Sequence, residues 1–171
     1  MSVPQTIALM PAEQYAVEQA RRESELGQLW DILDSVKDPE IPVLSIWELG
    51  ILRGLRMEGE EVVVTITPTY SGCPAMDAVA EDIGSALAAA GYRHSRIEMQ
   101  WAPAWSTSWM SPEGRDKLRN YGIAPPGEQT LCCPHCSSVE VELVSEFGST
   151  ACKALYRCES CLEPFDYFKN L

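Results

Sequence analysis

Apolar residues recur at helical spacing in two stretches of the N-terminal half of the chain. The first stretch predicts a helix from about residue 12 to residue 36, with apolar positions at Leu26, Leu29, Trp30, Leu33 and Val36. Pro39 must end it, because the residue before a proline is driven out of the helical region. The second stretch predicts a helix after Pro74 and before Gly91, with an apolar stripe at Met76, Val79, Ile83 and Leu87.

Alternation with a period of two predicts three strands. Residues 62, 64 and 66 are branched apolar residues that alternate with residues 63, 65 and 67, which is typical of a half-buried strand. Residues 51–57 and a turn at 58–60 precede it, so we expect a hairpin, and residues 97–101 predict a third strand. A short helix opens at Ser111 and ends near Gly122. This order predicts a two-layer α+β domain, a three-stranded sheet covered on one face by helices.

Composition narrows the class of protein. The chain has 171 residues, 46% apolar and 22% charged, which is normal for a soluble globular protein. Its N-terminus has no basic segment followed by an apolar run, and no stretch approaches the ~20 apolar residues of a membrane helix, so we expect a cytoplasmic protein without membrane association. Thirteen basic and 25 acidic residues give a net charge of −12, which disfavours nucleic acid and favours protein partners.

Cysteines are distributed unevenly, and this divides the chain. Of seven cysteines, six lie in the last 40 residues: Cys132, Cys133, Cys136, Cys152, Cys158 and Cys161. We therefore expect an N-terminal tail and start of the first helix over residues 1–23, the α+β domain over 24–124, a linker over 125–131 and a second unit over 132–171. Thiols of a cytoplasmic protein stay reduced, so these cysteines are expected to be metal ligands or reactive groups.

Two CxxC pairs in the second unit predict a zinc ribbon. Cys133 and Cys136 form the first pair, and Cys158 and Cys161 form the second. Each pair fits a tight turn, and two such turns complete a tetrahedron around Zn²⁺. An iron–sulfur centre or a redox-active CxxC pair are the alternatives, with zinc favoured. Strands are expected over residues 139–146, 154–156 and 165–168, and the metal would supply stability that so short a segment lacks.

Three cysteines remain outside this ligand set. Cys132 could replace Cys133 as a ligand, although the Cys-Pro-His-Cys turn has the better geometry, and Cys152 is expected to be a small buried apolar residue. Cys73 follows a predicted strand and precedes a predicted helix, where unpaired backbone N–H groups stabilise a thiolate. On residue pattern alone, a functional thiol and a packed cysteine are equally good interpretations of Cys73.

Several motifs carry a resemblance to known families. Residues 38–43 (Asp-Pro-Glu-Ile-Pro-Val) and 67–74 (Thr-Pro-Thr-Tyr-Ser-Gly-Cys-Pro) resemble the MIP18 family, also called the domain of unknown function 59. Residues 105–110, 121–126, 147–158 and 163–169 resemble the PaaD-like proteins of bacterial phenylacetate degradation. The resemblance runs from about residue 24 to residue 171 and covers nearly the whole chain.

The resemblance implies a non-enzymatic accessory role. PaaD-like proteins are grouped with the multicomponent phenylacetyl-CoA epoxidase, which has a di-iron oxygenase and an iron–sulfur flavin reductase, and MIP18-type domains are associated with iron–sulfur cluster assembly. The implied function is assembly or repair of the iron or iron–sulfur centres of those two components, its protein clients. Cys73 would be the functional thiol that transiently binds iron or a cluster, and Asp38 and Glu40 would form the family's acidic loop.

Other functions remain open at this stage. A single thiol cannot hold a cluster alone, so sharing across a homodimer is one expectation. A stable, non-catalytic scaffold subunit of the epoxidase is the alternative function. A nucleic-acid adapter is disfavoured because residues 126–171 carry three basic and seven acidic side chains.

Overall fold

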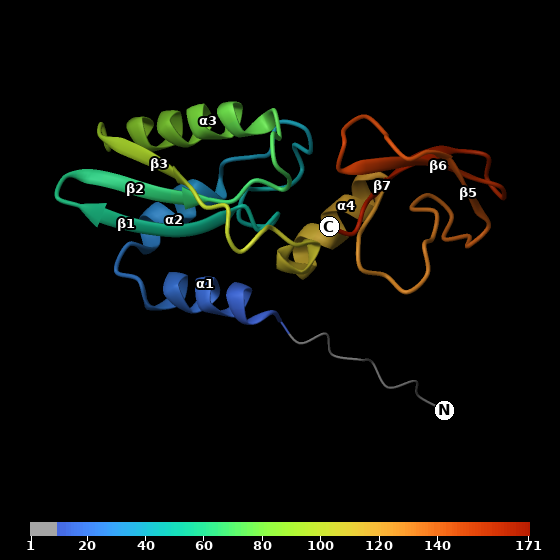
Figure 1. The fold of residues 1–171 in the computed structure, drawn as a ribbon, viewed down its shortest axis with the longest axis horizontal. Helices are drawn as coiled ribbons and strands as arrows, with labels where there is room; N and C mark the ends of the chain where they lie inside the picture. Colours follow the sequence, from blue (N-terminus) through green and yellow to red (C-terminus); the bar gives the residue numbers. More distant parts are fainter. Residues whose placement is uncertain (1–9) are drawn as a thin grey trace.

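A computed structural model describes residues 10–171, which form two β-sheets with four α-helices (Figure 1). The N-terminal elements are α1 (Ala12–Glu23), α2 (Gly27–Asp34), β1 (Leu52–Glu58), β2 (Glu61–Ile66), α3 (Ala75–Ala89), β3 (Ser95–Met99), the 3₁₀ turn η1 (Thr107–Trp109) and α4 (Pro112–Tyr121). The C-terminal elements are β4 (Ile123–Ala124), β5 (Val141–Ser145), β6 (Lys153–Cys158) and β7 (Pro164–Phe168). Within residues 10–171, no helix has the length and apolar character to cross a bilayer.

The first sheet confirms the predicted α+β domain. Its strand order is β1-β2-β3, with β1 antiparallel to β2 and β2 parallel to β3. Helix α3 makes the crossover between the two parallel strands, as such connections require. Val62, Val64 and Ile66 of β2 lie in one core with Leu33 of α2 and Ile83 of α3, and all five are buried. The alternation in the sequence therefore identified the core face of β2.

The opposite face of the sheet is covered by charged side chains. Val63 of β2 is buried, and the register places it between Arg56 of β1 and Arg96 of β3 on the same face. Arg56 donates hydrogen bonds to Glu98 at 2.9 and 3.0 Å, and Arg96 donates one to Glu61 at 3.2 Å. The aliphatic stems of these arginines account for the burial of Val63 while their charged groups remain in water.

The single helix expected over residues 12–36 is wrong. Ser24 is extended, with ψ at 135°, and its hydroxyl accepts a hydrogen bond from the N–H of Leu26 at 3.0 Å. A serine hydroxyl that bonds nearby backbone competes with helical hydrogen bonding, so the chain breaks there into α1 and α2. Helix α1 then packs beside β1, where Arg53 donates a 2.6 Å hydrogen bond to Gln14 (Figure 1).

The second sheet is a four-stranded ribbon in the order β4-β7-β6-β5. The three strands expected after residue 132 are present, and β4 adds a fourth by pairing in parallel with β7. Helix α4 ends at Gly122, whose φ of 92° turns the chain directly into β4. Residues 123–124, at the expected end of the first domain, are therefore part of the ribbon sheet.

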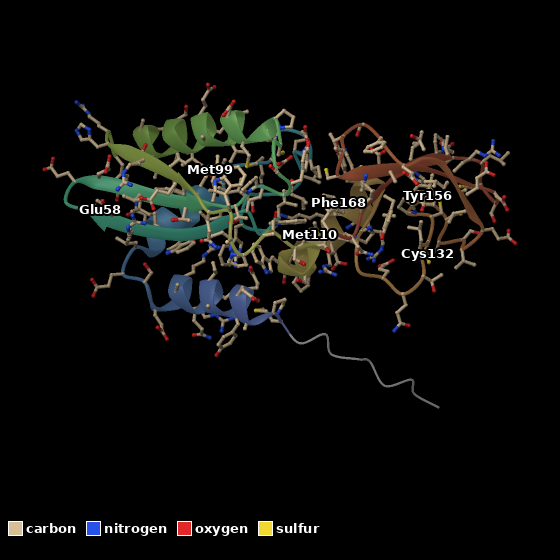
Figure 2. The ribbon with its side chains drawn as sticks, viewed as in Figure 1. Glu58, Met99, Met110, Cys132, Tyr156 and Phe168 are labelled. Atoms are coloured by element: carbon tan, nitrogen blue, oxygen red, sulfur yellow. The ribbon has the colours of Figure 1, made fainter. Side chains whose placement is uncertain are left out.

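The ribbon and the first domain share a core. Phe168 of β7 is fully buried in the first domain's apolar cluster, with its ring centroid 5.9 Å from that of Trp105. Cys152 belongs to the same cluster, and the C-terminal carbonyl of Leu171 accepts a hydrogen bond from the N–H of Thr107 at 3.2 Å. Figure 2 places Phe168 at the junction of the two parts, beside Met110.

Replacing Phe168 is expected to destabilise both parts together. We predict that Phe168→Ala lowers the free energy of unfolding by ~3–5 kcal/mol, because it leaves a cavity in the shared core. Phe147→Ala is the matched control, since that ring is 65% exposed and lies 4.5 Å from the Lys169 ammonium. Urea unfolding followed by circular dichroism measures both. Equal losses in the two variants would contradict the shared core.

Candidate metal centre and thiol site

Two backbone turns of the same design carry the four ribbon cysteines. In the first, the N–H of Ser137 donates to the carbonyl of Cys133 at 2.8 Å, and Ser137 has a φ of 63°. In the second, the N–H of Leu162 donates to the carbonyl of Cys158 at 3.0 Å, and Leu162 has a φ of 66°. Each left-handed residue follows the second cysteine of its pair, so both turns direct two sulfurs to one side.

The four sulfurs converge with the spacing of a metal site. The Sγ atoms of Cys133, Cys136, Cys158 and Cys161 all lie within 4.8 Å of one another. Cys133 and Cys161 are 3.7 Å apart at sulfur, and Cys136 and Cys158 are 3.5 Å apart. A tetrahedron with metal–sulfur bonds of ~2.3 Å has edges of ~3.8 Å, so the arrangement fits a tetrahedral ion.

A backbone group favours the thiolate form at one of the four sulfurs. The N–H of Cys161 donates to the sulfur of Cys158 at 3.5 Å and lowers the pKa of that thiol, whereas, against the effect of a backbone hydrogen bond, burial and the neighbouring sulfurs raise the pKa of Cys161. Because metals bind the thiolate form, a cation would stabilise the ionised form of all four sulfurs. The ribbon's own apolar core contains four buried residues, of which Cys133 and Cys158 are two, alongside Ala124 and Phe165. Metal binding therefore stabilises a segment with little other core.

Cys73 lies in a separate place, in the loop between β2 and α3. The loop turns at Gly72, whose φ is 80°, and the N–H of Cys73 donates to the carbonyl of Tyr70 at 3.2 Å. Pro74 then precedes the first residue of α3. The thiol of Cys73 is half-buried. It is thus held at the start of a helix, as the sequence indicated.

A small cavity adjoins this loop. Its volume is about 140 Å³, and its walls include Thr67, Tyr70, Ser71 and Trp101. Thr67 is 1% exposed, and its hydroxyl has no hydrogen-bond partner within residues 10–171. A buried hydroxyl without a partner is costly, so this group is available to a ligand in the cavity.

The acidic loop has a structural and an electrostatic role. The Asp38 carboxylate accepts hydrogen bonds from the N–H groups of Glu40 at 2.9 Å and Ile41 at 2.8 Å, which fixes the turn after α2. Burial raises the pKa of Asp38 despite these bonds. Burial, and then the charge of Asp38, raises the pKa of Glu40. Asp38 is therefore occupied by the backbone, and Glu40 is the freer carboxylate.

Tyr70 and Lys153 lie beside residues that the sequence indicated. Burial and then the charge of Cys73 raise the pKa of Tyr70 to about 12, and the N–H of Cys73 donates to the Tyr70 carbonyl at 3.2 Å. The charge of Lys153, which is also buried, partly offsets the rise in the pKa of Asp38 and of Glu40. Cys152 and Lys153 come from the ribbon, and no spacing rule predicts that this turn returns to the first domain.

A tight contact fixes the turn that carries Cys152 and Lys153. A Cβ on Gly148 would lie 2.6 Å from Oδ1 of Asp166, so only glycine fits there without displacement. The N–H of Gly148 donates to the carbonyl of Lys153 at 2.7 Å, and Ser149 donates to Asp166 at 3.0 Å. The nitrogen of Lys153 is 3.6 Å from the same carboxylate. The position of both residues follows from this packing.

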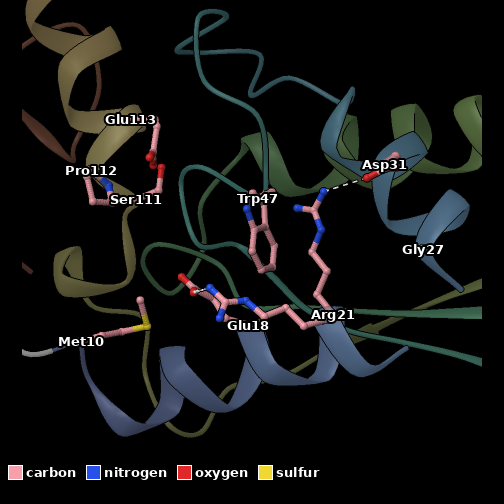
Figure 3. Close-up of a pocket in the computed structure, with 10 residues that line it drawn as sticks. Met10, Glu18, Arg21, Gly27, Asp31, Trp47, Ser111, Pro112 and Glu113 are labelled. Atoms are coloured by element: carbon pink, nitrogen blue, oxygen red, sulfur yellow. Dashed lines mark hydrogen bonds and ion pairs between the residues drawn. The ribbon is translucent and has the colours of Figure 1, made fainter. Parts of the chain in front are cut away.

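A larger cavity lies elsewhere and contains none of the predicted site residues. It measures about 600 Å³ and lies between α1, α2 and the start of α4 (Figure 3). Arg21 crosses it, with its guanidinium 4.4 Å from the Trp47 ring centroid and 3.0 Å from Asp31. The Arg21 guanidinium thus already has a carboxylate and an aromatic ring as partners within the chain.

Comparisons with known proteins define the class and then the family. Residues 27–97 match the family of iron–sulfur cluster assembly proteins, and residues 124–169 match the PaaD zinc beta ribbon domain. A crystal structure of the DUF59 domain from Bacillus anthracis is 25% identical, with a TM-score of 0.50, and the match covers 61% of this chain and 95% of that one. The class is therefore an iron–sulfur assembly domain joined to a four-cysteine ribbon.

Relatives of known sequence then specify the family. An Escherichia coli K12 protein, provisionally named as one of the subunits of 1,2-phenylacetyl-CoA epoxidase, is 48% identical over 85% of this chain and 93% of its own length. An Fe-S protein maturation auxiliary factor of Porphyromonas gingivalis is 33% identical over 51% of this chain and 84% of its own. The chain belongs to the PaaD-like family, within the wider MIP18 group of iron–sulfur assembly proteins.

Loss of one ribbon cysteine is expected to abolish metal binding there. We predict that the parent protein binds one metal ion per chain and that Cys158→Ser retains less than about a tenth of it, because three thiolates cannot close a structural site. Cys132→Ser is the control, since the Cys132 sulfur lies outside the four-sulfur cluster, 3.5 Å from the Thr130 carbonyl. Elemental analysis after anaerobic purification measures both, and full metal content in Cys158→Ser would contradict the assignment.

Two substitutions at Asp38 separate its hydrogen bonds from its charge. Asp38→Ala should cost ~1–3 kcal/mol of stability because two backbone N–H groups lose their acceptor. Asp38→Asn keeps an acceptor oxygen. Since the pKa of Asp38 is raised in the folded chain, its ionisation costs stability as pH rises above the ordinary value of 3.8.

We therefore expect Asp38→Asn to be at least as stable as the parent protein at pH 7. Below the ordinary pKa of the carboxyl group, the free energies of unfolding of Asp38→Asn and the parent protein should become equal, because Asp38 is then protonated in both the folded and the unfolded chain. Thermal unfolding at several pH values measures this. If Asp38→Asn were as unstable as Asp38→Ala, the turn-forming role would be contradicted.

Proposed function

We propose that this protein is a non-enzymatic accessory factor of the multicomponent phenylacetyl-CoA epoxidase, and that it assembles or repairs iron or iron–sulfur centres in the oxygenase or reductase. Membership of the PaaD-like family supports the link to the epoxidase. The Fe-S maturation factors among the relatives support a role in assembling iron–sulfur centres. The observation that carries the proposal is the position of Cys73. It is a half-buried thiol outside the four-sulfur cluster, in the loop between β2 and α3, where Tyr70 and Ser71 of the same loop line a small cavity.

The number of thiolates from one chain distinguishes a structural site from a transfer site. The ribbon supplies four converging thiols, which suits an ion that is held permanently. Cys73 lies outside that set and is half-buried, so a client's ligands could approach a metal bound to it. Transfer would be ligand exchange, in which a client donor replaces each donor of this site and no electrons move. Iron is the expected cargo, because thiolate and carboxylate donors both bind it.

The ribbon is proposed to bind a structural zinc ion and to contact the client. Zinc suits four thiolates in a tetrahedron without redox chemistry. The ribbon's surface carries exposed apolar side chains from β5 and the turns beside it: Val139, Leu143, Val144, Phe147 and Leu162. Exposed apolar groups on a strongly acidic protein favour a protein partner over nucleic acid.

A stable scaffold subunit is the second candidate, and the name of the Escherichia coli relative, which calls it a subunit, favours it. Stoichiometry separates the two functions. A scaffold would co-purify in a fixed ratio with the active epoxidase, whereas an assembly factor would be absent from it. An epoxidase that is active after this protein has been removed would support assembly.

Substitution of Cys73 tests the assembly function directly. We predict that Cys73→Ala keeps the fold and the ribbon metal but reduces epoxidase activity in cells by at least ~10-fold, because the cargo loses its thiolate. Cys132→Ala is the matched control and should support normal activity. Oxidation of phenylacetyl-CoA in cells with a chromosomal replacement is the measurement, with circular dichroism and metal content of each purified variant. Full activity with Cys73→Ala would refute the proposal.

A further inference from the structure

Strand β5 has an open side. The ribbon order β4-β7-β6-β5 leaves β5 at one edge of the sheet, and no segment within residues 10–171 pairs with its outer side. The opposite edge strand, β4, is only two residues long and contacts α4. Figure 1 shows β5 on the side of the ribbon away from the first domain. An uncovered edge strand presents free backbone donors and acceptors to another chain.

The ladder with β6 indicates which backbone groups of β5 are free. The carbonyl of Glu140 accepts a hydrogen bond from the N–H of Glu159 at 2.8 Å, and the register continues from this pair into β5. Hydrogen-bonded positions alternate along an antiparallel pair, so the backbone of Glu142 bonds toward β6. Val141 and Leu143 therefore direct their N–H and C=O groups outward, where a further strand could bond to them.

Apolar side chains gather at this edge. Val139, Leu143 and Val144 are each at least half exposed, and Phe147, which follows β5 in the chain, is 65% exposed. A strand added beside β5 would cover Leu143 in particular, because that residue lies in the stretch whose backbone groups are free. The edge thus offers both hydrogen bonds and apolar area, the two contributions that binding by strand addition requires.

Charge decides between a second copy of this chain and a different protein as the occupant. Residues 126–171 carry three basic and seven acidic side chains, and the three basic ones already contact acceptors within the ribbon: Lys153, Arg157 and Lys169. The exposed carboxylates of Glu140 and Glu146 have no cation partner among residues 10–171. Two copies paired through β5 would bring these acids together, whereas Lys or Arg of another protein would neutralise them.

The alternation of side chains in β5 then specifies the pattern of its partner. Val141 and Leu143 lie on one face of the strand, and Glu142 lies on the other. Directly opposed side chains on one face contact each other in a sheet, so an apolar residue fits beside Leu143 and a basic residue fits beside Glu142. The complementary strand is one in which apolar residues alternate with Lys or Arg.

We propose that the outer edge of β5 is the docking site for an extended segment of a client protein in which apolar residues alternate with Lys or Arg, and that this segment adds a fifth strand to the ribbon sheet. This inference rests on the proposed function, which supplies protein clients, and deepens it by naming where and how a client is bound. It does not depend on the thiol of Cys73.

Amide-resolved NMR on the full chain, supplied with zinc, tests the edge with a defined probe. The probe is a short capped peptide in which valine alternates with lysine. At saturation it should slow hydrogen exchange of the N–H groups of Val141 and Leu143 at least ~10-fold, whereas the N–H of Glu142, already bonded to β6, should change little. A peptide with glutamate in place of lysine should bind at least ~10-fold more weakly. The lysine peptide with its strand-bonding amides methylated should weaken by a similar factor.

A proline in β5 tests the same edge from the side of the protein. Leu143→Pro removes an outward donor and no bond to β6, because proline is tolerated where the N–H of an edge strand faces solvent. It should weaken binding of the lysine peptide at least ~10-fold. Leu143→Ala keeps the N–H and should lose less, and Tyr15→Ala, at an exposed position of α1, should match the parent protein. Zinc content and circular dichroism verify that each variant is folded.

The outcomes separate this inference from the function on which it rests. Exchange at Val141 and Leu143 that the lysine peptide leaves unchanged, or equal binding of the lysine and glutamate peptides, would overturn the docking site and leave the role of Cys73 as proposed. Protection of the same two amides at high protein concentration without any peptide would show that a second copy occupies the edge, and would also overturn it.

Activity in cells completes the separation. Leu143→Pro should lower epoxidase activity, and full activity in that variant would overturn β5 as the site of client docking. If Leu143→Pro lowered the activity and Cys73→Ala did not, the docking site would stand and the assembly function would fail.

Discussion

Closure of the four-sulfur tetrahedron is the interaction on which the C-terminal half of this protein depends. The ribbon's own apolar core has four buried residues, and two of them are ligand cysteines, so the strands would have little to pack on without the ion. Strands β6 and β7 lead from this cluster to the first domain, where Phe168 of β7 and Cys152, one residue before β6, lie in the apolar core.

The seven cysteines differ in their surroundings. Four converge at one point between two matching turns, and one, Cys132, lies beside a backbone carbonyl away from that point. Cys73 is half-buried in the loop before α3, and Cys152 is buried in the apolar cluster of the first domain. The same residue type therefore converges at one point in the ribbon and packs against apolar neighbours elsewhere.

Much of the fold followed from the sequence because its signals are local. The alternation at residues 62–66 identified the core face of β2, and Pro74 and Gly91 bounded α3 closely. The two CxxC pairs predicted the turns whose sulfurs now lie together. These inferences need only neighbouring residues, and the physical rules behind them act over a few positions.

The parts that could not be predicted depend on contacts between distant segments. The break at Ser24 lets α1 pack beside β1, where Arg53 contacts Gln14 from 39 positions away. β4 exists only because β7 returns beside it, and the burial of Cys152 depends on a core built by the first domain. Apolar periodicity carries no information about such long-range pairings, so the packing of the ribbon onto the first domain could be found only in three dimensions.

The close approach at Gly148 gives this arrangement a signature in the sequence. Its missing side chain leaves just enough space for the carboxylate of Asp166, which accepts a hydrogen bond from Ser149 and lies 3.6 Å from the Lys153 nitrogen. A homologous chain with a larger residue there would have to displace that carboxylate and so loosen its contacts with the turn. Glycine at this position together with an aspartate on β7 is thus a pattern by which ribbons with this turn can be recognised in a sequence.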